Sequence, residues 1–204
     1  AVVIPALVPA DVAGLFFSEY AEGSSNNKYL EIYNGSDQVI DLTGLAFPSS
    51  SNAVSNPGVF EYWNEFPAGA TIEVGDVYII AHPSSDASIL ALADHTHTYL
   101  SNGDDGYCLV EGTEDSYVLV DCIGDWNNTD DDMWWDVAGV SEATHEHTLV
   151  RKASVVVGNA GDWDMSAGTD IENSEWVVLD RDEWVYLGSH PHEFAPPEVS
   201  LVIT

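Results

Sequence analysis

LFFSEYAEGSSNNKYLEIYN, residues 15–34, is the stretch that decides the fold. Apolar and polar residues alternate in its first half, and its second half carries Tyr, Leu and Ile around the single glutamate Glu31. The intervening residues 22–27 (EGSSNN) are rich in Gly, Ser and Asn, which supply the backbone conformations of a tight corner. Two short strands around such a loop predict a β-hairpin that nucleates a sheet.

Short apolar segments separated by turns continue along the whole chain. Val77–Ala81 is almost continuously apolar, which is typical of a central strand. Residues 86–93 (DASILALA) form the one segment with a helical pattern, and Ser85 or Asp86 would cap it. This pattern predicts an all-β, immunoglobulin-like sandwich with one short helix and long loops. Strands are expected at residues 38–47, 71–81, 107–110, 117–122, 147–157, 175–179 and 183–187.

Charge is the unusual feature of the composition. The chain has 204 residues, enough for one large domain with a substantial core, and 45% of them are hydrophobic. It carries 35 acidic and 4 basic residues, a formal net charge of -31. Such a surface repels phosphate backbones, so we expect no direct binding of nucleic acid. The simplest explanation of the charge is a solvated acidic surface that suits salty or calcium-rich water and does not indicate any particular partner. Because no apolar run reaches roughly 18 residues, we also expect no membrane span.

Two cysteines flank one predicted hairpin. Cys108 and Cys122 lie symmetrically about residue 115, inside the turn EGTEDS. They would therefore face each other across paired strands, which predicts a disulfide and an extracytoplasmic location. A pair of buried thiols is the alternative.

Several motifs arrive in an order that belongs to a known family. The chain resembles the bacterial lamin-tail domain of secreted multidomain proteins over most of its length, roughly residues 15–190. The resemblance implies an immunoglobulin-like sandwich without catalytic residues of its own, often beside a nuclease or phosphatase domain or a sorting segment. Residues 48–62 and 125–135 depart from the family pattern. The motifs are SEYAEGSSNNKYLEIYN (18–34), DLTGLAF (41–47), FPAGATIEVGDVYIIAH (66–82), SILALAD (88–94), SNGDD (101–105), TLVRKASV (148–155), EW (175–176) and LGSH (187–190).

The same motifs suggest a division of the chain. We assign residues 15–192 to the lamin-tail-like sandwich. Residues 1–14 are expected to form an N-terminal extension or strand. Residues 193–204, with two consecutive prolines, are expected to form a linker or the start of a next domain.

Three of the four basic residues fall inside the family motifs: Lys28, Arg151 and Lys152. In a chain with so few cations, this placement predicts a structural ion-pair network, in which an arginine held by two carboxylate oxygens is the strongest geometry. The alternative is a pocket for an anionic ligand. The expected acidic partners are Glu19, Glu31, Asp104 and Asp105.

Clusters of carboxylates make calcium a candidate cofactor. Carboxylate oxygens are the ligands that Ca²⁺ prefers, and so much clustered charge is costly without a cation. None of the clusters has the spacing of an EF-hand loop, and repulsion relieved by solvent and salt is the alternative. The candidate ligands are Asp104, Asp105, Asp125, Asp130, Asp131, Asp132, Asp162 and Asp164.

Histidines and asparagines supply weaker candidates. Asn34 and Asn127 begin short glycosylation sequons. Six histidines come in pairs two residues apart, and such residues share one face of a strand, which suits zinc or copper if a third ligand is added. Exposed loop histidines are the alternative. The pairs are His95 with His97, His145 with His147, and His190 with His192.

No nucleophile, phosphate-loop or zinc-protease motif occurs in the sequence, so we do not expect an enzyme. The expected function is that of a secreted or cell-surface module with structural, tethering or protein-interaction roles, whose partners are other protein domains or copies of itself. One alternative is a subunit of a surface layer or filament that assembles through its apolar ends, residues 2–8 and 199–203. Another is an accessory domain of a secreted nuclease or phosphatase acting through bound calcium.

Overall fold

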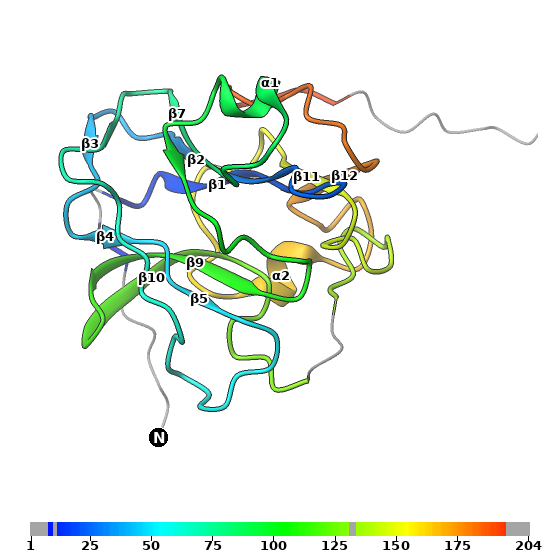
Figure 1. Ribbon diagram of the computed structural model, residues 1–204, viewed down its shortest axis with the longest axis horizontal. Coiled ribbons are helices and arrows are strands. Elements are labelled where there is room, and N and C mark those ends of the chain that lie inside the picture. Colours follow the sequence, from blue (N-terminus) through cyan, green and yellow to red (C-terminus); the bar gives the residue numbers. More distant parts are fainter. Residues whose placement is uncertain (1–7, 10–11, 131–133, 195–204) are drawn as a thin grey trace, which may run out of the picture.

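Two β-sheets form the layers of the domain in the computed structural model, which describes residues 8–9, 12–130 and 134–194 (Figure 1). The upper layer in Figure 1 is a six-stranded sheet with the order β12-β11-β1-β2-β7-β8. All its neighbouring strands are antiparallel except β7 and β8. Its strands are β1 (Leu15–Glu22), β2 (Lys28–Asn34), β7 (Val77–Ala81), β8 (His95–Thr96), β11 (Thr148–Arg151) and β12 (Trp176–Leu179).

The lower layer is a four-stranded sheet built on a second hairpin. β10 pairs with β9, and β9 pairs in turn with β4 and β5. A separate two-stranded ribbon joins β3 to β6. The arrangement is an immunoglobulin-like sandwich, as expected. The strands are β9 (Gly106–Thr113), β10 (Ser116–Ile123), β4 (Leu45–Ala46), β5 (Ser49–Ser50), β3 (Ile40–Asp41) and β6 (Thr71–Ile72).

The hairpin predicted at residues 15–34 is confirmed. β1 and β2 pair from Leu15 opposite Asn34 to Glu22 opposite Lys28, with a bulge that shifts the register between Phe17 and Glu19. β2 then pairs with β7 on its other side, so the hairpin occupies the middle of the larger sheet. A central position explains why the whole of β1 is buried.

The main core lies between the two sheets. Phe17 and Ile32 of the upper sheet belong to the same buried cluster as Leu109 and Val120 of the lower sheet. Val12, in the predicted N-terminal extension, is buried in it too. Each large apolar side chain buried in this way stabilises the fold by about 1.5–3 kcal/mol.

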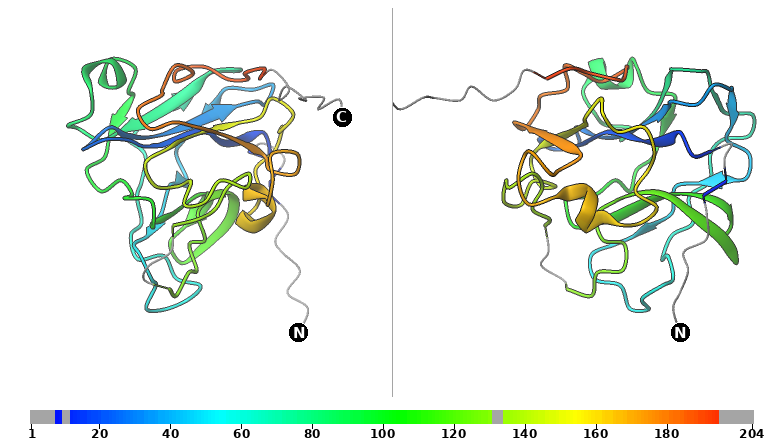
Figure 2. Two further views of the ribbon diagram at one scale, coloured as in Figure 1. Left: turned by 90° about the vertical axis from the view of Figure 1, so that its right-hand side faces the viewer. Right: turned by 180° about the vertical axis from the view of Figure 1, so that it is seen from behind.

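The outer face of each sheet is also covered. On the upper sheet, α1 (Ala87–Leu90) and Leu187 pack over Tyr29 and Ile79, and the orange-to-red C-terminal segment runs across this face in both views of Figure 2. On the lower sheet, Phe60 from the cyan loop packs with Trp126. The segments at 48–62 and 125–135, which depart from the family pattern, thus contribute to this outer layer.

The helices differ in part from the expectation. α1 is shorter than residues 86–93, and its cap is Asp86, whose Oδ1 accepts from the backbone N–H of Ser88 at 2.8 Å. A second helix, α2 (Trp163–Ala167), was not expected, so the prediction of one helix was wrong. Asp162 caps it by accepting from the backbone N–H of Met165 at 3.1 Å. The helix forms because Trp163 and Ala167 are buried in the main core.

Several strand expectations also need correction. The segment 38–47 divides at Gly44, whose φ of +86° turns the chain, so β3 and β4 belong to different sheets. The segment 71–81 supplies β6 and β7, which pair with other strands and not with each other. In the segment 147–157 only Thr148–Arg151 is a strand, and residues 183–187 contain no strand. Neither helix among the described residues has the length or the apolar character that a bilayer crossing requires.

Candidate functional site

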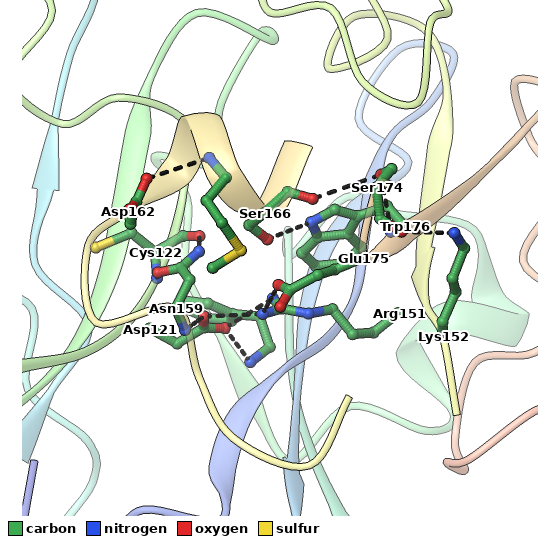
Figure 3. Close-up of polar contacts among 12 residues, drawn as sticks. Asp121, Cys122, Arg151, Lys152, Asn159, Asp162, Ser166, Ser174, Glu175 and Trp176 are labelled. Carbon is green, nitrogen blue, oxygen red and sulfur yellow. Dashed lines mark hydrogen bonds and ion pairs between the residues drawn. The ribbon is translucent and has the colours of Figure 1, made fainter. Parts of the chain in front are cut away.

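Arg151 joins the two sheets through a buried ion pair (Figure 3). Its side chain starts on β11 in the upper sheet and reaches Asp121 on β10 in the lower sheet, with both side chains fully buried. Nη1 lies 3.1 Å from Oδ2 and Nη2 lies 3.2 Å from Oδ1. Nη2 also donates to Oε2 of Glu175 at 2.7 Å. This is the two-oxygen geometry in which arginine and carboxylate interact most strongly.

Two strand irregularities bring Asp121 into this position. The register of β10 shifts between Leu119 and Asp121, and that of β1 shifts between Phe17 and Glu19. The Asp121 carboxylate therefore also accepts from the backbone N–H groups of Phe17 and Asn159, each at 2.8 Å. Burial raises the pKa of Asp121, while Arg151 and these two N–H groups act to lower it.

The surroundings of Arg151 complete its enclosure. Its guanidinium carbon lies 4.5 Å from the ring centroid of Trp176 and 5.7 Å from that of Phe16, distances at which a cation is attracted to an aromatic face. The Trp176 indole N–H donates to Oγ of Ser166 on α2 at 3.0 Å. Lys152 donates to the carbonyl oxygen of residue 174 (Figure 3) and also to that of residue 171. The Arg151 side chain is thus completely buried among groups of the fold itself.

The other two cations are also bonded within the fold. The Lys28 ammonium donates to the carbonyl oxygen of Ser101 at 2.8 Å and to Oδ1 of Asn102, and it forms an ion pair with Glu22, whose Oε1 lies 3.2 Å away. Arg181, about half exposed, pairs with Glu146.

The expected partners of the cations were therefore wrong in the case of Glu19 and Glu31. These two carboxylates face each other across β1 and β2, almost completely buried. The Tyr29 hydroxyl donates to Glu19. Glu31 accepts from the Ser18 hydroxyl at 2.7 Å and from the backbone N–H of Gly188 at 2.6 Å. Burial raises the pKa of Glu31 to about 7, and burial together with Glu31 raises that of Glu19.

The predicted disulfide is confirmed. Cys108 and Cys122 are directly opposed in the β9–β10 register, and their sulfur atoms are bonded. Both residues are fully buried in the outer cluster of the lower sheet, beneath Phe60 and Trp126.

The candidate calcium ligands are dispersed. Asp105 accepts from the Ser51 hydroxyl at 3.1 Å and from the backbone N–H of Asn52 at 3.0 Å. Burial raises the pKa of Asp105, and the charge of Lys28 acts to lower it. Within 8–9, 12–130 and 134–194, no three His, Cys, Asp or Glu side chains are grouped so as to hold a metal ion. Calcium binding therefore stays a prediction. Asp125 and Asp162 accept from nearby backbone N–H groups, Asp130 and Asp164 are exposed, and Asp131 and Asp132 lie outside the described residues.

The paired histidines pack against aromatic rings. His95 and His97 both lie edge-on to Phe47, with centroids 5.8 and 5.4 Å apart. His145 stacks on a tryptophan, and its partner His147 faces the carbonyl oxygen of His145. His190 packs against one aromatic ring of β1 and one of β2, whereas His192 packs against a tyrosine of the C-terminal segment.

The two sequon asparagines also have structural partners. The Asn34 side chain is completely buried, and its amide donates to three backbone carbonyl groups, at residues 38, 72 and 73. The Asn127 side chain accepts from the backbone N–H of Gly58 at 2.6 Å. Asn34 is thus inaccessible to a glycosyltransferase.

One pocket of about 590 Å³ opens where several loops meet. It lies beside Lys28, and its walls come from the β1–β2 turn, from the segments around residues 49–51 and 62–64, from His82 after β7 and from residues 97–107. Its volume falls in the range of small-molecule sites, roughly 300–1,000 Å³. Sequence reasoning missed it because the lining residues come from five separate segments. The exposed Tyr62 and Tyr99 were the only local signal of such a site.

Comparison with known proteins identifies one family. The family model described as Lamin Tail Domain matches residues 9–190. Searches of curated proteins and of solved structures each gave no match. The match extends over nearly the whole chain, including both sheets, the Arg151 network and the pocket.

Proposed function

Because this chain belongs to the lamin tail domain family, we propose that it is a non-catalytic extracellular module that holds other molecules in place by binding them. The observation that carries the proposal is the use of its cations. Lys28, Arg151, Lys152 and Arg181 are all the basic residues of the chain, and each is bonded to carboxylate or carbonyl oxygens of the fold itself. The four basic side chains therefore stabilise the fold, and the pocket is the part of the surface that we expect to bind a partner.

The framework suits a binding role because both its layers are fixed to each other. The bond from Arg151 to Asp121 joins the sheets, and the outer faces are covered by loops. Binding residues are most often found on loops that a rigid scaffold positions. The pocket, at the meeting point of such loops, fits this arrangement.

The disulfide and the acidic surface support an extracellular location. Disulfides persist in oxidising compartments and are rare in the cytosol. A high net charge keeps a protein soluble and separate from its neighbours. Both features are what a secreted or surface-attached module needs.

The location is tested in the native host. Cells and medium are treated with a thiol-reactive label before and after reduction, and the protein is detected by immunoblot. We expect it in the medium or at the cell surface, with both cysteines labelled only after reduction. An intracellular protein with free thiols would overturn the proposal.

The non-catalytic character needs its own assay. The purified chain is incubated with a phosphomonoester, a phosphodiester and DNA, with calcium and with chelator, and no turnover above the blank is expected. Turnover that one carboxylate substitution abolishes would show that the chain is an enzyme.

A further inference from the structure

The loop-end pocket, lined by residues of the β1–β2 turn and of the segments at 49–51, 62–64, 82 and 97–107, has a polar and mostly uncharged lining. Three amide side chains and three hydroxyl groups lie along its walls: Asn26, Asn64, Asn102, Ser49, Ser51 and Thr98. Amides and hydroxyls both donate and accept hydrogen bonds, so such a lining matches a ligand that does both along its length.

The charged members of the lining are already engaged. The Lys28 ammonium donates to Ser101 and Asn102, and its charge is paired with that of the buried Glu22 carboxylate. Asp105 accepts from Ser51 and from the backbone of residue 52. Lys28 is therefore not available to neutralise an anionic ligand.

Two imidazoles in the lining are neutral hydrogen-bonding groups. Burial lowers the pKa of His82 and of His97, so both rings are uncharged at neutral pH. His82 Nδ1 accepts from the backbone N–H of Ser84 at 3.0 Å, which directs its other ring nitrogen away from that turn. The pocket thus lacks an available cation, in a chain whose net charge is -31.

Two exposed aromatic rings belong to the same pocket. Tyr62 is 57% exposed and Tyr99 is 80% exposed. Aromatic rings have an apolar face and, in tyrosine, a hydroxyl at the edge, which is why they are enriched where a surface binds a partner. Flat rings beside amides and hydroxyls suit a ligand with an apolar C–H face and a polar edge.

We propose that this pocket binds a neutral carbohydrate, with Tyr62 and Tyr99 stacking on sugar rings while Asn26, Thr98 and His82 contact hydroxyl groups. The proposal rests on the function proposed above and names the class of molecule that the module holds. An anionic polymer would be repelled by the surrounding charge. A cationic peptide would be attracted to the whole acidic surface and not to this pocket in particular.

The test measures binding of the 204-residue chain to immobilised neutral oligosaccharides of glucose, mannose, galactose and N-acetylglucosamine. Polygalacturonate, single-stranded DNA and a lysine-rich peptide are the comparison probes. We expect binding to at least one neutral sugar, with a dissociation constant that changes little with salt. Tyr62→Ala and Tyr99→Ala should each weaken it about tenfold, and Tyr→Phe at the same positions should retain most of it.

The tyrosine variants should remain folded because both side chains are exposed and contribute little to the core. Val156→Ala is the control, since Val156 is 68% exposed and does not line the pocket. Its affinity should equal that of the unchanged protein. Binding to no neutral sugar, equal binding of polygalacturonate or DNA, binding of the peptide alone, or undiminished binding by the double Tyr→Ala variant would each overturn the proposal. If the protein is nevertheless secreted with an oxidised disulfide, only the carbohydrate proposal fails, and the module's binding role is retained.

Discussion

Arg151 is the residue on which the relation of the two sheets depends most. Its guanidinium is fully buried between Asp121 and Glu175, whereas Arg181 makes a similar ion pair at the surface. Exposed ion pairs contribute little because water and side-chain entropy offset the attraction. Removing one member of a buried pair leaves an uncompensated charge away from water. The two arginines therefore form a natural comparison.

Replacing Arg151 by Met, which retains much of the side-chain volume, should destabilise the protein by about 3–5 kcal/mol because Asp121 loses its counter-charge. Arg181→Met should change the stability by less than about 1 kcal/mol. Urea unfolding followed by tryptophan fluorescence measures both values. Equal losses in the two variants would show that Arg151 holds no special position.

The Glu31 carboxyl makes stability dependent on pH. Burial raises its pKa from 4.5 to about 7, so the folded protein binds more protons than the unfolded chain between these values. Its contribution to stability is therefore present below pH 4.5 and lost as pH rises through about 7, a change of about 3 kcal/mol. In the variant Glu31→Gln, the side chain is uncharged at every pH, and its amide oxygen can still accept the hydrogen bond from the backbone N–H of Gly188.

The measurement is urea unfolding at pH 5 and at pH 8. We expect the unchanged protein to lose more stability between these pH values than the Glu31→Gln variant. Parallel losses in the two proteins would contradict a buried Glu31 that titrates near neutrality.

Among the elements, the hairpins were predictable from sequence and the irregular segments were not. The β1–β2 and β9–β10 hairpins follow from alternation around a turn, a local signal. By contrast, α2 has five residues, and it forms because its buried side chains have tertiary partners. The same limit applies to the site: Asp121 and Glu175 were missed as partners of Arg151 because a bulge and a distant loop bring them there. The pocket was missed for the same reason.

The disulfide restricts the β9–β10 hairpin. It joins cysteines separated by 14 positions, and in the chain-entropy account a loop of this size stabilises the fold by about 3 kcal/mol. The double variant Cys108→Ala with Cys122→Ala should lose about that much in urea unfolding. Reductant should lower the midpoint of the unchanged protein and leave that of the variant where it is. A variant as stable as the oxidised protein would contradict this account.

For the molecule as a whole, the dominant quantity is the net charge of -31. Like charges on a compact surface repel, and salt shortens the range of that repulsion from about 30 Å at 0.01 M to about 3 Å at 1 M. We therefore expect the melting temperature to rise by several degrees as sodium chloride increases over this range. A melting temperature that does not respond to salt would show that the acidic groups are too well separated to matter.

Calcium is separated from this general effect by comparison at equal ionic strength. A specific site, if the acidic clusters form one, should raise the melting temperature in calcium chloride above that in magnesium chloride, and chelator should reverse the rise. Identical curves in the two salts would remove the case for a calcium ion.

The contact between Arg151 and Asp121 constrains how the sequence can change during evolution. Positions 121 and 151 lie on different sheets, yet substituting one of them leaves the charge of the other without a counter-charge in the buried core. We expect a double substitution to apolar residues to cost less than the two single substitutions added together. In homologous sequences, we therefore expect positions 121 and 151 to covary: either both residues are retained or both are substituted.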